Sequence, residues 1–382
     1  MKRTFPCLLW CACALLFKGV AWAGAPGSTG ANFLEFGEGP RAAGMGESQV
    51  AVADDAYAAF WNPAGLAALE YANVALTYNQ ALQGVNQQYF SLAYPLHRGS
   101  TLDLNLTRLG MTPFSGYDAV GTKTGDVTAS DYALGLAYGR TILLDDLVRP
   151  RLNLGLGVKA VQETLDNVTA RTYAVDAGAL YYLHWLEFSG DAGRPDAGLR
   201  LAATARNMGV GLKFDSVVSP LPTTYQTGLA WRAYPWGDPL TLSCDQVFSK
   251  DQSAYMGFGV EFTVYRMLSF RAGFRGGQDI GSGIRAGVGF KLKVIDLDYA
   301  YGNFGNLGQM QRIGISARLG GPVDTTAPEE RTLQAILDRG QRLMKEGRYY
   351  EAVLELDQAM QIDPGNRKAL EMMRRANDKL HQ

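Results

Sequence analysis

The sequence predicts an all-β membrane protein: an antiparallel outer-membrane β-barrel of about fourteen strands, with an N-terminal hatch and a small α-helical C-terminal domain. Apolar residues recur at every second position between residues 73 and 319, as in Met256–Val264 and Ile284–Leu292. Successive side chains of a strand point to opposite faces, so each segment has one apolar face and one small or charged face. Many segments approach the 9–11 residues, roughly, with which a tilted strand crosses a bilayer.

A soluble β-sandwich shows the same alternation because its core face is apolar, so a soluble periplasmic β-protein is the alternative fold. Two features favour the membrane. Tyr and Trp cluster at segment ends, where aromatic girdles lie, and a charge facing lipid at mid-depth costs about 2–4 kcal/mol. The charged residues in the register expected to face a polar lumen are Asp103, Arg285, Lys291, Lys293, Asp296, Asp298, Arg312 and Arg318.

Residues 1–23 predict a cleavable secretory signal. Two basic residues precede the apolar run Phe5–Val20, and Ala21-Trp22-Ala23 supplies a small-x-small cleavage site. Cys11 follows the bulky Trp10, which disfavours lipoprotein processing. After cleavage Cys244 would be the one remaining cysteine, so no intramolecular disulfide is expected.

Composition and motifs predict a protein that is not an enzyme. The net charge is −1 and 19% of the residues are charged, which gives no indication of nucleic-acid binding. The three histidines, His97, His184 and His381, have no carboxylate or cysteine at metal-ligand spacing. No Gly-x-Ser-x-Gly elbow is present. We therefore expect no cofactor, no metal and no catalytic residue, with a hydrolase inside the barrel as the minor alternative.

Residues 24–72 predict a compact segment ahead of the first strand. The segment is rich in glycine and contains the run Asn62-Pro63-Ala64-Gly65. Pro63 fixes its own φ and biases Asn62 away from helix, so this run should form a tight bend. Such a segment can fold back into the lumen as a plug or form a periplasmic rim at the base of the barrel.

The same segment carries a recognisable signature. Arg41–Gly46 (RAAGMG), Val50–Ala56 (VAVADDA) and Trp61–Leu66 (WNPAGL) resemble the N-terminal signature of the PorV/PorQ family. That family belongs to the outer-membrane barrels related to the long-chain fatty-acid transporter FadL. The resemblance implies a fourteen-stranded barrel with an N-terminal hatch. By resemblance, the hatch and gating residues are Gly44, Gly46, Asn62, Pro63, Ala64 and Gly65.

The resemblance implies a location and two possible functions. FadL-like members transport hydrophobic small molecules across the bacterial outer membrane without catalysis. PorV-like members are accessory or shuttle components of type IX protein secretion and act through protein partners. The expected partners are therefore the lipid bilayer and either a hydrophobic small molecule or a secreted protein.

The C-terminal part changes to a helical period. After a linker at residues 320–331, residues 332–382 match one tetratricopeptide repeat with a third, capping helix. The residues expected to serve partner binding are Gly340, Leu343, Gly347, Tyr350, Ala352, Leu356, Ala359 and Pro364. One repeat is fewer than the three or so that an independent solenoid needs. We expect this tail in the periplasm, either as an adaptor for a periplasmic protein or as a passive cap on the barrel.

Overall fold

The computed structural model describes residues 27–81, 84–145, 149–183, 196–278, 280–323, 328–363 and 365–380. The predicted signal at residues 1–23, as well as Pro364, His184 and His381, lies outside the described residues. The chain divides into two compact units, residues 1–323 and 324–382, and each is described by itself.

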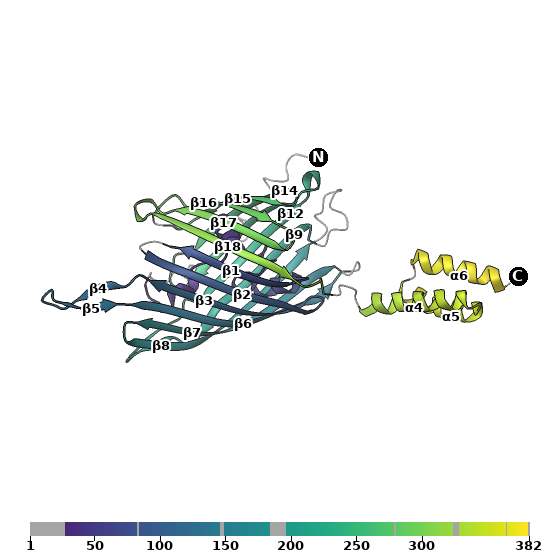
Figure 1. Ribbon diagram of the computed structural model, residues 1–382, viewed down its shortest axis with the longest axis horizontal. Coiled ribbons are helices and arrows are strands. Elements are labelled where there is room, and N and C mark those ends of the chain that lie inside the picture. Colours follow the sequence, from purple (N-terminus) through teal and green to yellow (C-terminus); the bar gives the residue numbers. More distant parts are fainter. Residues whose placement is uncertain are drawn as a thin grey trace. The chain divides into compact units, whose positions relative to one another are not determined.

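The first unit is a closed antiparallel barrel of fourteen strands, which confirms the predicted fold class (Figure 1). The barrel strands are β1 (Ala72–Gln80), β2 (Val85–His97), β3 (Ser100–Met111), β6 (Ala129–Leu144), β7 (Pro150–Leu165), β8 (Val168–Leu183), β9 (Gly198–Gly209), β12 (Thr224–Ala233), β13 (Leu240–Ser249), β14 (Tyr255–Val264), β15 (Leu268–Arg275), β16 (Ile284–Lys291), β17 (Ile295–Asn303) and β18 (Gln309–Leu319). Each strand pairs with its sequence neighbour in the ring, and β1 closes it against β18 with Ala72 opposite Leu319.

The alternation of the sequence becomes an outward apolar face and an inward polar face. Leu102 and Leu104 of β3 are exposed on the outside of the barrel, whereas Asp103 between them is completely buried. Arg285 and Arg312 are also buried inside. These charged side chains therefore point into the lumen, as the sequence predicts.

Lys293 departs from the expected lumen register. It lies exposed in the turn at residues 292–294, between β16 and β17. The turn residues Leu292 and Val294 continue the apolar alternation beyond the end of the strand, so the pattern overestimates the strand length. The next two carboxylates are paired: Asp296 accepts from Arg318 at 3.2 Å, and Asp298 from Arg271 at 2.5 Å.

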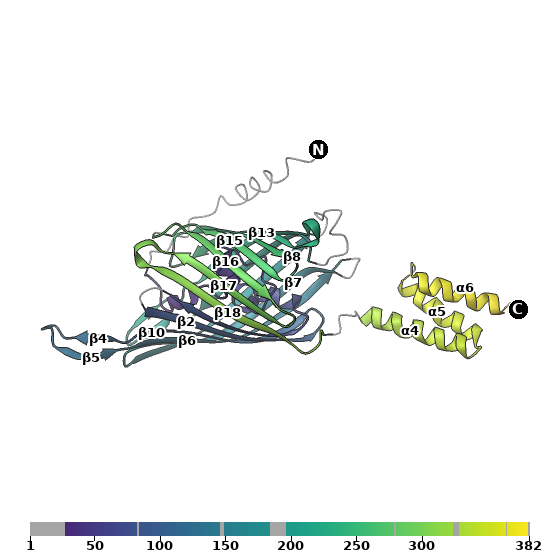
Figure 2. The same cartoon turned by 45° about the horizontal axis from the view of Figure 1, so that its top comes forward.

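The two ends of the barrel carry different connections. Turns at residues 98–99, 265–267 and 292–294 lie at the end where β1 begins and β18 stops, and we call this the short-turn end. The opposite, long-loop end carries the hairpin of β4 (Phe114–Tyr117) with β5 (Lys123–Val127), which projects beyond the other strands (Figure 2). It also carries β10 (Leu212–Phe214) paired with β11 (Val217–Ser219). In outer-membrane barrels the short turns are periplasmic.

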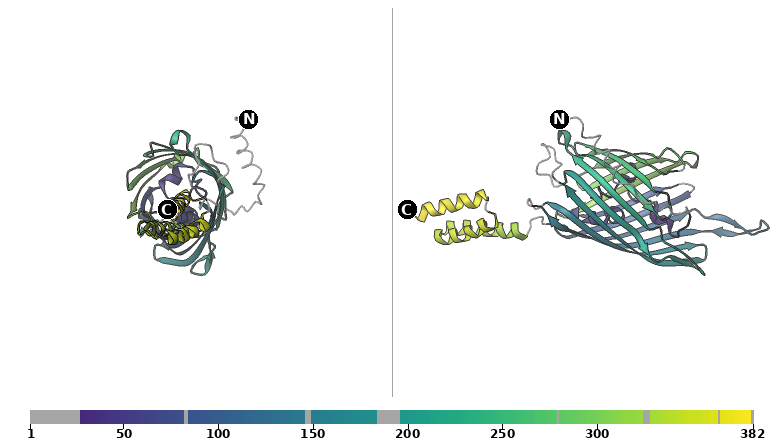
Figure 3. Two further views of the ribbon diagram at one scale, coloured as in Figure 1. Left: turned by 90° about the vertical axis from the view of Figure 1, so that its right-hand side faces the viewer. Right: turned by 180° about the vertical axis from the view of Figure 1, so that it is seen from behind.

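The segment before β1 fills the lumen. It forms short helices: η1 (Asn32–Glu35), α2 (Pro40–Gly44), α3 (Ala58–Trp61) and η2 (Pro63–Ala68). The left view of Figure 3 looks along the barrel and shows this segment, in purple, inside the ring of strands. At the long-loop end the Ser28 amide donates to Asp251 (2.9 Å), and at the short-turn end the segment runs into β1. The hatch is therefore a plug through the lumen and not a rim below it.

The second unit is three helices: α4 (Pro328–Lys345), α5 (Tyr349–Ile362) and α6 (Arg367–Leu380). Its core includes Leu337, Leu356 and Ala369, one residue from each helix. Helix α4 starts at Pro328, earlier than residue 332, where the sequence placed the helical segment; proline is favoured in the first turn of a helix. Among the described helices, none combines the length and apolarity needed to cross a membrane.

Candidate functional site: the hatch and its seat

The Asn-Pro-Ala bend is fixed by the side chain of Asn62. Its Oδ1 atom accepts from the Ala64 amide at 3.1 Å and caps η2. Its Nδ2 atom donates to the carbonyl of Val50 in the hatch (3.0 Å) and of Ala179 in β8 (3.2 Å). Asn62 is completely buried and extended, with φ −156°, the conformation expected before proline. One amide group thus joins the bend to both the hatch and the barrel wall.

Glycines of three neighbouring strands receive this bend. A Cβ added at Gly155 would lie less than 3.0 Å from the Ala64 nitrogen, and one at Gly178 less than 3.0 Å from Asn62 Oδ1. A Cβ at Gly139 would lie 2.5 Å from the Pro63 carbonyl oxygen. We call these three residues, Gly139, Gly155 and Gly178, the Asn-Pro seat. No larger residue fits there without moving the backbone of the hatch.

A second set of wall glycines receives the hatch turn at residues 44–46. A Cβ at Gly273 would lie less than 3.0 Å from the Gly46 nitrogen, and one at Gly259 would be 2.7 Å from the Met45 Cβ. Gly46 itself has φ +65° and faces the backbone of Phe274, so a side chain there would be both strained and blocked. We call the wall residues Gly257, Gly259, Gly273 and Gly287 the Gly-Met-Gly seat.

Asp54 of the hatch is surrounded by three arginines. Arg41 of α2 lies 2.6 Å away, and Arg232 of β12 and Arg200 of β9 lie 2.8 and 3.1 Å away. Burial by itself would raise the pKa of Asp54, but Arg232, Arg41 and Arg200 together hold that pKa well below its usual range. Asp54 is therefore ionised and links the hatch to two wall strands.

Arg41 also links the same region to strands further along the ring, beyond β13. Its guanidinium forms two bonds to Glu261 of β14, at 2.9 and 2.8 Å. Glu261 also pairs with Arg271 of β15 at 2.7 Å, and Arg271 with Asp298 of β17 at 2.5 Å. The bidentate geometry is the strong form of a guanidinium–carboxylate contact. Removing Arg41 would leave Glu261 with Arg271 as its arginine partner, and breaking a buried ion pair is destabilising.

Two further hatch carboxylates differ in charge state. Burial would raise the pKa of Glu47, but Arg275, 3.1 Å away, and neighbouring arginines lower it. Glu38 is completely buried and accepts from Gln87 Nε2 at 2.6 Å and Thr107 Oγ1 at 3.2 Å. Burial raises the pKa of Glu38 to about 8, against the opposing effect of Arg312. Glu38 is thus mostly protonated at neutral pH, and Glu47 is ionised.

A polar cavity of about 470 Å³ lies at the short-turn end of the lumen. Hatch residues Asp54, Asp55 and Tyr57 line it together with wall residues such as Arg232 and Lys291. Water in this cavity can reach the ion pairs that hold Asp54. Within the described residues, no group of three or more His, Cys, Asp and Glu side chains could hold a metal ion.

The structure brings most of the predicted hatch residues to the two seats. Gly44 and Gly46 lie on one seat, and Asn62, Pro63 and Ala64 lie on the other. Gly65 instead packs inside the hatch, where a Cβ would collide with the carbonyl of Ala53. Sequence reasoning missed the partners on the wall, namely Gly139, Gly155, Gly178, Gly257, Gly259, Gly273, Gly287, Glu261, Arg200 and Arg232.

The predicted tail residues are mostly structural. Leu343, Ala352, Leu356 and Ala359 are buried, and a Cβ at Gly340 would lie 2.9 Å from Leu356. These positions hold α4 and α5 together and cannot contact a partner directly. Among the described members of the set, the exposed ones are Tyr350, with 67% of its surface accessible, and Gly347, which has φ +78° in the α4–α5 turn.

Comparison with known proteins gives matches by structure alone. A scan against protein-family models finds no match, and neither does a search of curated protein sequences. The TodX monoaromatic hydrocarbon channel (deltaS2 mutant) has a TM-score of 0.51 at 11% identity, over 74% of this chain and 99% of that one.

Two further solved structures match less well. A Pseudomonas aeruginosa FadL homologue has a TM-score of 0.40 at 12% identity, over 73% of this chain and 97% of that one. The Acinetobacter baumannii outer membrane protein Omp33 has a TM-score of 0.37 at 11% identity, over 65% of this chain and 98% of that one. At such low identity the likeness to TodX shows the fold alone. The chain has the fold of an outer-membrane β-barrel like that of the TodX channel.

Proposed function

We propose that the chain transports small hydrophobic molecules across the outer membrane, and that displacement of the hatch controls their passage. The observation that carries this proposal is the position of the hatch, which runs through the lumen between two glycine seats. A molecule can pass only if part of the hatch leaves its seat. The likeness to TodX, a monoaromatic hydrocarbon channel, supports a hydrophobic cargo.

The contacts of the hatch suit reversible displacement. The wall glycines of the seats carry no side chains, so at these positions a hatch segment can lift away without displacing a wall side chain. The charged contacts around Asp54 border the polar cavity at the short-turn end, where water can solvate the separated ions. Hydration of both partners reduces the cost of breaking a buried ion pair. The hatch turn near Arg41 is therefore the segment proposed to move first.

The test is uptake of a radiolabelled monoaromatic hydrocarbon by cells with an intact outer membrane. Cells that express the full chain should take up the hydrocarbon faster than cells that express none. Expression of Arg41→Gln should also admit small polar dyes, because its hatch is loosened. Equal hydrocarbon uptake with and without the chain would remove the transport proposal.

For the tail we propose a periplasmic location and an adaptor role. Strand β18 stops at the short-turn end, which faces the periplasm in outer-membrane barrels. Tyr350 and Leu354 lie one turn apart on α5 and expose 67% and 53% of their surfaces, which would suit an apolar partner. A role in type IX-like protein secretion has no support among the comparisons. Affinity purification of the wild-type chain and of the double variant Tyr350→Ala/Leu354→Ala tests the adaptor role. Recovery of the same proteins with both chains would contradict it.

A further inference from the structure

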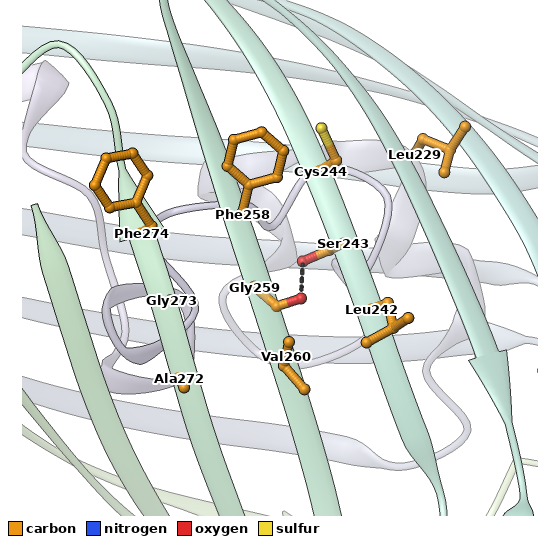
Figure 4. Close-up of a pocket in the computed structure, with 10 residues that line it drawn as sticks. All are labelled: Leu229, Leu242, Ser243, Cys244, Phe258, Gly259, Val260, Ala272, Gly273 and Phe274. Carbon is orange, nitrogen blue, oxygen red and sulfur yellow. Dashed lines mark hydrogen bonds between the residues drawn. The ribbon is translucent and has the colours of Figure 1, made fainter. Parts of the chain in front are cut away.

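An apolar recess of about 390 Å³ opens on the outward face of the barrel, across β12 to β15 (Figure 4). Two rows of outward side chains border it. One row runs across four paired strands and consists of Leu229, Cys244, Phe258 and Phe274. The second row, two residues along each strand, consists of Leu242, Val260 and Ala272. Phe274 and Val260 are 44% and 43% exposed, as expected of side chains that face lipid.

The recess exists because two of these outward side chains are small. Cys244 stands beside Phe258 in its row, and Ala272 stands beside Val260 in the other. Most outward positions of the barrel carry larger apolar side chains, such as Leu134 and Leu156. A thiol and a methyl group therefore leave a hollow between the aromatic rings and the aliphatic side chains.

The floor of the recess is the thin part of the wall that also seats the hatch. Between the two outward rows, the inward row is Ser243, Gly259 and Gly273. The Ser243 hydroxyl donates inward to the carbonyl of Ser48, at 3.0 Å. The two glycines touch Met45 and Gly46 on their lumen side. One layer of backbone thus separates the lipid side from the hatch.

We propose that this recess binds the acyl chain of a bilayer lipid. The recess is continuous with the apolar surface by which the barrel contacts the membrane, so hydrocarbon is the medium that meets it. Its outward lining consists of Leu, Val, Ala, Phe and Cys side chains, which offer dispersion contacts. A chain held there can contact the side chains of both outward rows and the backbone between them.

This lipid site is distinct from the proposed transport of cargo and stands on its own. It also places a hydrocarbon chain against the outer side of the Gly-Met-Gly seat. Filling the recess with protein should displace the lipid and leave the lumen face of the wall unchanged. The substitution Ala272→Phe does this, since its side chain points outward in the second row.

The experiment is native mass spectrometry of the full-length protein extracted from the outer membrane, with stepwise delipidation. Wild type should keep a phospholipid after the remaining lipid is removed, and Ala272→Phe should not. Ala286→Phe is the matched control, because Ala286 is the outward register partner of Ala272 on β16 and does not line the recess. It should keep the lipid as wild type does.

A second variant protects the test against misfolding. Cys244→Phe fills the same recess from the other row and should lose the lipid as Ala272→Phe does. Equal retention in wild type and in both recess variants would overturn the proposal. Retention of a small hydrocarbon in place of a phospholipid would overturn the assignment to an acyl chain.

Discussion

The two seats hold the hatch against nearly opposite walls of the barrel by different forces. The Asn-Pro seat on β6, β7 and β8 receives a bend without a charged residue, held by hydrogen bonds of Asn62 and by backbone packing. The Gly-Met-Gly seat on β14, β15 and β16 is flanked by the pairs Arg41–Glu261 and Glu47–Arg275. One wall is a neutral anchor, and the other is an ionic contact that water, salt and pH can weaken.

The largest expected effect comes from breaking the ionic side. Arg41→Gln removes the arginine that Glu261 and Asp54 share, although each keeps another arginine partner. Breaking a buried ion pair costs about 3–5 kcal/mol, which here would destabilise the seated position of the hatch. Single-channel conductance in planar bilayers should rise, because the turn at residues 41–47 leaves its seat. Arg318→Gln is the control: its partner Asp296 lies at 3.2 Å and the pair is partly exposed, so it should cost less than about 1 kcal/mol. Equal conductance in both variants would contradict the role of Arg41.

A smaller effect is expected from the neutral side. Gly155→Ala places a methyl group against the Ala64 nitrogen, and overpacking of this kind costs about 1–3 kcal/mol. Limited proteolysis should then cleave the hatch faster than in wild type. Gly157→Ala on the same strand meets nothing closer than 3.6 Å and should behave as wild type. If the two alanine variants are cleaved at the same rate, the bend is not seated as described.

The smallest effect per step of the experiment is a pH dependence through Glu38, because it is spread over several pH units. Its pKa is raised from 4.5 to about 8 in the folded protein. The folded state therefore binds the proton more tightly, so the contribution of Glu38 is fully present below pH 4.5 and is lost as pH rises through about 8. The slope is at most about 1.4 kcal/mol per pH unit. Proteolysis of the hatch between pH 5 and 9 should accelerate in wild type and stay flat in Glu38→Gln. A flat wild-type profile would contradict a buried, protonated Glu38.

The sequence predicts the barrel well because the bilayer imposes one repeated demand on every strand. Each strand must turn an apolar side chain outward, so alternation along residues 73–319 indicates strands, and charges such as Asp103 fall inside. The prediction errs at strand ends, where Lys293 lies in a turn with apolar neighbours. The local sequence pattern is sufficient to predict structure wherever the surrounding medium, and not a specific partner residue, determines which residue type fits.

The two glycine seats could not be predicted from the sequence, because each depends on specific partner residues in the hatch. Gly155 and Gly157 are equivalent in the run Leu-Gly-Leu-Gly, yet the hatch lies against the first and leaves room at the second. Arg41 stands in the recognisable signature, but its partner Glu261 is 220 residues away. Both contacts depend on how the hatch crosses the lumen, which no local spacing encodes. The bend at Asn62 is predictable because proline restricts the backbone of the residue before it.

The most direct test of the two-wall account is hydrogen–deuterium exchange of hatch amides, followed by mass spectrometry while ionic strength is raised. Peptides covering residues 41–47 should lose protection first, since salt and water weaken the pairs at the ionic wall. Peptides covering residues 62–68 should stay protected throughout, because neutral contacts hold them. Loss of protection at both segments together, or first at residues 62–68, would contradict the account.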